Sequence, residues 1–195
     1  MGDRTPIEWT ESTWNPTTGC DRTSPGCDHC YALTLAKRLK AMGTGKYQND
    51  GDPRTSGPGF RLTLHPDTLD QPRRWRQPRT VFVNSMSDLF HNDVPIAYIR
   101  DVFAVIADTP QHQYQVLTKR SKRLATISDR LDWPTNLWMG VSVENASYRF
   151  RVDHLRRVPA ALVRAVGGDG VVHIADGRHA RDQADFFTFE LVRVA

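Results

Sequence analysis

Three cysteines, Cys20, Cys27 and Cys30, are the only cysteines in the chain, and they lie in one segment rich in glycine, proline and threonine. Their spacing is Cys-x6-Cys-x2-Cys. A Cys-x2-Cys pair at a turn directs two sulfurs toward one metal or cluster edge, and a third thiolate upstream can close that face. The odd number of thiols fits poorly with paired disulfides, so the segment is typical of a metal-binding or redox loop.

Three thiolates suit two kinds of metal centre. One is a 4Fe–4S cluster in which one iron has no protein ligand, and the other is zinc completed by a histidine, for which His29 or His91 is available. Sulfur is too soft a donor for magnesium or calcium. The sequence has no second Cys-x2-Cys pair, and His29 lies inside the existing pair, where it is poorly placed to complete a zinc site. The residues alone leave both centres open, beside the plainer alternative of three unrelated reduced thiols.

Apolar patterns around the cysteine loop (residues 19–31) predict alternating strands and helices. A first short strand is expected near Trp9 and Trp14. The predicted helices cover residues 29–42, 95–108, 122–131 and 146–157, and the predicted strands cover 61–64, 80–84, 113–118 and 136–142. This order predicts an α/β fold with parallel strands joined by right-handed crossovers.

Polar residues follow each of the later strands at the point where the strand ends. They are Asn84, Ser85 and Asp88 after one strand, Thr118, Lys119 and Arg120 after the next, and Ser142, Glu144 and Asn145 after the last. Ligands of parallel sheets bind at the carboxyl ends of the strands. We therefore expect these residues and the cysteine loop to share one rim and to build one pocket.

Four basic residues form a second group of interest: Lys119, Arg120, Lys122 and Arg123. They could hold a phosphate or a nucleic-acid backbone, although a solvated helix start explains them equally well. Asp88 and His91 could act as an acid–base pair, with a helix cap as the plainer role for Asp88. The net charge of +4 permits a polyanionic partner without requiring one.

The overall composition predicts one soluble domain with a real core. The chain has 195 residues, of which 39% are hydrophobic and 25% charged, a balance that argues against disorder. No apolar run reaches the roughly 20 residues that span a bilayer, and the first residues lack a signal-peptide pattern. We expect a cytoplasmic protein without membrane contact. The strand–helix rhythm fades after residue 162, so we predict a main unit at 1–162 and a divergent tail at 163–195, in which only 171–174 and 185–194 have the composition of strands.

Four motifs carry a family resemblance: T-W-N-P-T-T-G-C-D-R-T-S-P-G-C-D-H-C-Y-A, V-F-V-N-S-M-S-D-L-F, V-L-T-K-R and L-W-M-G-V-S-V-E-N. Together, in this order, they resemble a phage-associated family of unassigned function that is labelled after phage gene products thirty-seven and sixty-eight. That family is similar to the radical S-adenosylmethionine (SAM) superfamily. The resemblance covers roughly residues 5–160.

The resemblance implies a partial (β/α) barrel, a 4Fe–4S cluster and SAM bound at the open iron. If the protein is active, an electron donor reduces the cluster and SAM is cleaved to a radical that abstracts hydrogen from a substrate, for which we expect a relation to nucleic acid. Carried over by position, Cys20, Cys27 and Cys30 would ligate the cluster. The residues expected at the amino group of SAM are Asn84, Ser85 and Ser87, and those facing SAM from a later strand are Ser142, Glu144 and Asn145.

The sequence also departs from the superfamily pattern. The first cysteine gap has six residues where three are usual, His29 stands where an aromatic residue is common, and no Gly-Gly-Glu follows the second strand. The altered tail suggests a shifted reading frame or a truncated gene near Val163. Two alternatives are therefore kept: a non-catalytic nucleic-acid-binding module stabilised by zinc or a cluster, and an inactive phage-derived remnant.

Overall fold

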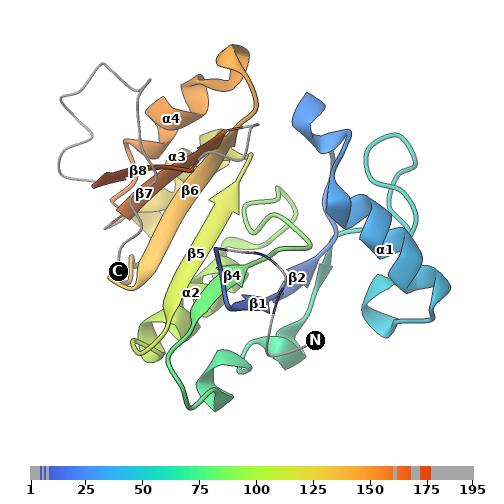
Figure 1. Ribbon diagram of the computed structural model, residues 1–195, viewed down its shortest axis with the longest axis horizontal. Helices are drawn as coiled ribbons and strands as arrows, with labels where there is room; N and C mark the ends of the chain where they lie inside the picture. The colour runs from blue at the N-terminus through green and yellow to red at the C-terminus, as the bar shows by residue number, and fades with distance from the viewer. Residues whose placement is uncertain (1–4, 6, 8, 160–161, 168–171, 177–195) are drawn as a thin grey trace.

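The computed structural model describes residues 5, 7, 9–159, 162–167 and 172–176, and they form a mixed α/β fold around one main sheet (Figure 1). The strand order in this sheet is β1-β4-β5-β6-β7-β8. The first five of these strands run parallel to their neighbours, and β8 is antiparallel to β7. The bounds are β1 (Ser12–Trp14), β4 (Thr80–Val83), β5 (Gln113–Thr118), β6 (Leu137–Val143), β7 (Leu162–Gly167) and β8 (Val172–Asp176). The expected α/β sheet with parallel strands is confirmed.

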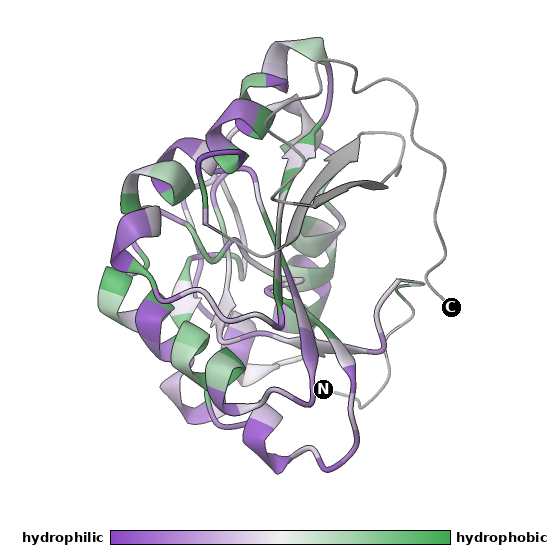
Figure 2. Cartoon of the chain, turned by 90° about the vertical axis from the view of Figure 1, so that its left-hand side faces the viewer, coloured by the Kyte–Doolittle hydropathy of each residue, from purple (hydrophilic) through white to green (hydrophobic). Residues whose placement is uncertain are grey.

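Figure 2 shows helices gathered on one side of the main sheet. The helices of the described residues are α1 (Tyr31–Ala41), α2 (Ile96–Asp108), α3 (Ser121–Ile127) and α4 (Phe150–Leu155). A second, small antiparallel sheet pairs β2 (Thr17–Thr18) with β3 (Thr63–Leu64) and lies beside the start of the cysteine loop.

The main core forms because strands and helices each present one continuous apolar surface. In α2, Ile99, Val102, Phe103 and Ile106 recur at helical spacing and are all buried. They pack with Trp14 from β1 and with the buried residues of β4, β5 and β6 in one hydrophobic core. The core fixes the four strands side by side, so the loops that follow them emerge at the same edge.

The elements match the predictions most closely where the apolar pattern is long. The predicted strand at 113–118 has these bounds, and α1, α2 and β6 lie within two residues of their predicted limits. The helix expected at 122–131 instead ends at Ile127 and continues as a 3-10 turn, Ser128–Arg130. The helix expected at 146–157 is divided into a 3-10 turn, Ala146–Tyr148, and the short helix α4.

Strand β7 pairs with β6 over residues 162–167, where the sequence predicts no strand. The strand expected at 171–174 is present as β8. The strand expected at 185–194 lies outside the described residues. No helix in the described part of the chain is long and apolar enough to cross a membrane.

Candidate functional site

The cysteine loop lies against the carboxyl ends of three neighbouring strands. At its start, Gly19 forms a β-bridge with Ser87, which follows β4, and the Gly19 N–H donates to the carbonyl of Met86 over 2.9 Å. Beyond β5, the guanidinium of Arg120 donates to the carbonyl of Asp21 over 3.1 Å. Beyond β6, Glu144 accepts a hydrogen bond from Ser24. The loop and the three strand ends therefore form one rim.

The three thiols of the loop are free, and each is partly exposed. Cys20 and Cys30 pack against the same apolar patch, which consists of Ala32, Ala36, Tyr47, Phe60 and Met86. Cys27 ends a 3-10 turn, Pro25–Cys27, and the hydroxyl oxygens of Thr23 and Ser24 lie 3.9 Å from its sulfur. Cys30 immediately precedes α1 and occupies its N-cap position.

The surroundings of Cys20 and Cys27 shift their thiol pKa values in opposite directions. Burial, with the charge of Asp88, raises the pKa of Cys20 to about 12 despite the nearby Arg120. Burial alone would also raise the pKa of Cys27, but hydrogen bonds from the Thr23 and Ser24 segment and the charge of Lys119 outweigh it and lower the pKa. Cys27 is thus more easily ionised than Cys20.

Two cations that follow β5 act on the thiols. Arg120 Nη2 lies 3.8 Å from the sulfur of Cys20 and is close enough to donate a hydrogen bond to it. Lys119 acts on Cys27 through its charge. Three thiolates carry three negative charges, and cations beside them offset part of that repulsion. The chemistry of this donor set, with its apolar patch on one side, fits a thiolate-ligated iron–sulfur cluster.

The histidines considered for a zinc site are occupied or turned to solvent. His91 is buried; its Nδ1 accepts from the Asp93 N–H over 3.2 Å, and its Nε2 lies 2.9 Å from a carboxylate oxygen of Asp21. Because Nδ1 accepts, Nε2 carries the hydrogen and donates a hydrogen bond to Asp21. His29 is exposed. Within the described residues, no three His, Cys, Asp or Glu side chains converge as a site for one metal ion.

The residues expected near the amino group of SAM are brought together, and they hydrogen-bond to the segment that follows β1. The Asn84 amide donates to the Thr17 hydroxyl over 2.9 Å, and the Ser87 hydroxyl lies 2.6 Å from the same oxygen. The Ser85 hydroxyl pairs with the amide of Asn15. Asn84 is buried and has a φ of 60°, a left-handed conformation that asparagine tolerates better than most residues. The network fixes the chain reversal after β4.

The second expected group divides into three different roles. Glu144 accepts from the Ser24 hydroxyl over 2.6 Å and pairs with Arg151 over 2.7 Å, so it ties the cysteine loop to α4. Ser142 accepts from Arg151 through its backbone carbonyl. Asn145 caps the next turn by accepting from the Ser147 N–H. Among these three residues, a side-chain hydrogen bond to the cysteine loop is found for Glu144.

Asp88 has a structural role that the sequence did not reveal. Its carboxylate accepts from the Phe90 N–H, from the Thr118 hydroxyl over 2.7 Å and from the Lys119 N–H over 3.0 Å. These bonds join the end of β4 to the end of β5. The carboxylate that meets His91 is that of Asp21, 70 positions away, and no local pattern could have indicated this pair.

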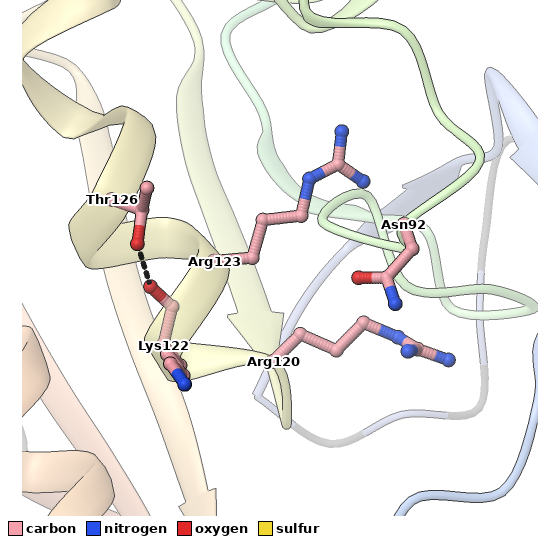
Figure 3. A pocket seen from close by; sticks show the side chains of 5 residues that line it. All are labelled: Asn92, Arg120, Lys122, Arg123 and Thr126. Atoms are coloured by element: carbon pink, nitrogen blue, oxygen red, sulfur yellow. Dashed lines mark hydrogen bonds between the residues drawn. The ribbon is translucent and has the colours of Figure 1, made fainter.

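The four basic residues divide between the thiols and a hollow. Arg120 contacts the thiol of Cys20 and Lys119 acts on Cys27 through its charge, whereas Arg120, Lys122 and Arg123 line a hollow of about 350 Å³ together with Asn92 and Thr126 (Figure 3). The guanidinium of Arg123 also donates to the carbonyls of Phe90 and Val94. Arg120 is the residue shared by the hollow and the cysteine loop.

Comparisons with known proteins identify a family and a related fold. The model of the family described as "Protein of unknown function (DUF5131)" matches residues 4–168. No curated protein matches the chain. Among solved structures, the chain is similar to a mutant of spore photoproduct lyase, with a TM-score of 0.56 and 13% sequence identity over 86% of this chain and 47% of that chain. The chain thus spans about half the length of that protein, and a likeness at this identity shows the fold alone.

Proposed function

The chain belongs to this family of unknown function, and from that premise we propose that it is a radical-SAM-type protein which holds a 4Fe–4S cluster on Cys20, Cys27 and Cys30. One observation carries the proposal: the three-thiol loop lies on the carboxyl-end rim of parallel strands, with Arg120 hydrogen-bonded to Cys20. The main sheet would then be the wall of a partial (β/α) barrel. The related fold of a solved lyase supports this arrangement of strands.

When bound, such a cluster supplies electrons and an iron without a protein ligand, at which SAM can be chelated and cleaved. The chain's own residues prepare this position. The N–H of Arg120 and the charge of Lys119 stabilise thiolates at Cys20 and Cys27. Phe60 and Met86 exclude water from the side on which Cys20 and Cys30 pack. A dry surrounding strengthens the electrostatic interactions of the thiolates with these cations.

The strand ends would hold SAM. Ser85 and Ser87, beyond β4, offer hydroxyl groups near its amino group, and buried Asn84 fixes the turn that carries them. Across the rim, Ser142, Glu144 and Asn145 would face SAM from β6. Burial alone would raise the pKa of Glu144, but hydrogen bonds from Ser24 and Arg151 lower it, so its carboxylate is ionised at neutral pH and suits a cationic amino group. Turnover would also require an external electron donor.

A second candidate function is a nucleic-acid-binding module that uses zinc or a cluster only to shape the loop. The observation favouring it is a hollow lined by Arg120, Lys122 and Arg123, of which Arg120 also donates to the sulfur of Cys20. In this reading the metal orders the loop and the cations bind a phosphate backbone without catalysis.

Anaerobic reconstitution with iron and sulfide separates the two functions. We expect a brown protein with about four irons per chain, whereas Cys27→Ala loses most of its iron and the visible absorption of iron–thiolate bonds. A matched control is His29→Ala, which changes an exposed side chain between Cys27 and Cys30 but removes no thiol. A colourless protein that takes up one zinc per chain and no iron would defeat the cluster assignment.

A further inference from the structure

A basic hollow adjoins the cysteine loop, with which it shares Arg120. It has a volume of about 350 Å³ and opens between the start of α3 and the loop that contains Asn92 (Figure 3). Its cations are Arg120, Lys122 and Arg123, and its neutral polar groups are Asn92 and Thr126. The volume is that of a site for a small ligand group.

The charge of the hollow is only partly compensated. Within the described residues, no carboxylate forms an ion pair with Arg120, Lys122 or Arg123, although Arg151, Arg73 and Lys40 elsewhere each have one. Asp88 and Asp93 act on Arg123 at longer range, and Asp88 is occupied by its bonds to the end of β5. Lys122 is exposed. The hollow therefore attracts an anion.

The groups around the hollow also match one kind of anion. Two guanidinium groups, an ammonium group and an amide are donors that suit the several oxygens of a phosphoryl group, whereas the Thr126 hydroxyl donates to the carbonyl of Lys122. Arg120 retains a further donor, because its Nε is buried without a hydrogen-bond partner in the described part of the chain. Its Nη2 meanwhile contacts Cys20 and Asp21.

We propose that this hollow is a phosphate-binding subsite for a nucleotide or a nucleic-acid strand, and that Arg120 links it to the cysteine loop. The assignment of the hollow to a substrate rests on the proposed function. A phosphate ester bound there would lie next to the loop that would hold the cluster. A phosphate in the hollow competes for the Arg120 guanidinium, so its occupancy changes the hydrogen bond that Cys20 receives. Binding at the hollow is thereby coupled to the thiol site.

The test measures binding to the metal-free protein, so that it does not depend on a cluster. Three probes are titrated separately: inorganic phosphate, adenosine 5′-monophosphate and a fluorescent single-stranded DNA 12-mer. We expect Lys122→Ala to weaken binding of the probes about three- to tenfold and to lower the salt dependence of DNA binding by about one counterion. Lys37→Ala is the matched control, because it removes the same charge from an exposed position on α1.

The outcomes distinguish the sources of the phosphate and the two proposals. Tight binding of the DNA alone assigns the subsite to a strand, and equal binding of the mononucleotide assigns it to a nucleotide. Absence of binding by all three probes, or equal losses in Lys122→Ala and Lys37→Ala, overturns the subsite. A protein that binds DNA but forms no cluster retains the subsite and refutes the radical-SAM proposal instead. Thiol reactivity of Cys20 that is unchanged by a bound probe refutes the link through Arg120.

Discussion

Glu144 connects two parts of the rim through the two oxygens of its carboxylate. One oxygen accepts from Ser24 in the cysteine loop, and the other pairs with Arg151, which is almost fully buried. The close approach also requires glycine at position 26, because a Cβ there would lie 2.2 Å from the Glu144 side chain. This residue thus holds the loop against the end of β6, whether or not it also contacts SAM.

Glu144→Gln should lower the free energy of unfolding by about 2 kcal/mol, because a buried guanidinium loses its charged partner. Urea denaturation measures the change. Asp153→Asn is the control, since it removes the carboxylate of an exposed pair with Arg156 and should cost no more than about 0.5 kcal/mol. Equal losses in the two variants would show that Glu144 does not anchor the loop.

The same carboxylate should make stability depend on pH. Burial would raise the pKa of Glu144, but the bonds from Ser24 and Arg151 lower it below its usual 4.5. Its contribution is therefore complete above pH 4.5 and disappears as the pH falls through the lowered pKa. In unfolding measured from about pH 7 to about pH 3, the stability difference between the natural protein and Glu144→Gln should shrink at the acid end. A difference that stays constant would contradict the assigned pKa direction.

At the scale of elements, the start of the cysteine loop depends on Gly19. Its φ of 83° places it in the left-handed region, and a Cβ would lie 2.2 Å from the backbone oxygen of Arg61. The bridge to Ser87 and the bond to Met86 therefore require glycine at this position. A residue with a side chain would push the loop away from the end of β4.

Gly19→Ala should destabilise the protein by about 3 kcal/mol or more and reduce iron uptake on reconstitution, because conformational strain and collision act together. Gly43→Ala is the matched control: its φ is 74°, but open space surrounds the Cβ position, so it should cost about 1 kcal/mol. Denaturation curves and iron content of the two variants provide the comparison. Similar losses of stability and of iron in the two variants would show that the close contact between Gly19 and the backbone of Arg61 is unimportant.

Across the whole molecule, the sequence predicted what local apolar patterns determine. The strands β4, β5 and β6 and the helix α2 followed from long apolar runs, and their alternation predicted the parallel sheet and its shared rim. Bonds between distant residues were not predictable. The links of Asp88 to Thr118, of Asp21 to His91 and of Ser24 to Glu144 each join residues 30 or more positions apart. Strand β7 was missed because it follows the weakening of the strand–helix rhythm.

The division at residues 162 and 163 stays a prediction, as does the shifted reading frame proposed near Val163. The family model ends at residue 168, close to the change in composition. Translating the coding DNA in the other two frames should reveal a continuation that resembles the family. Frames without such a continuation would count against a shift.

The most direct test of the central claim is SAM cleavage by the reconstituted protein. With a strong one-electron reductant and no oxygen, we predict that the natural protein converts SAM to 5′-deoxyadenosine and methionine, detected by chromatography and mass spectrometry. The variant Cys30→Ala should form none above the level of reductant alone. A protein that contains a full iron–sulfur cluster yet neither binds nor cleaves SAM would contradict the account.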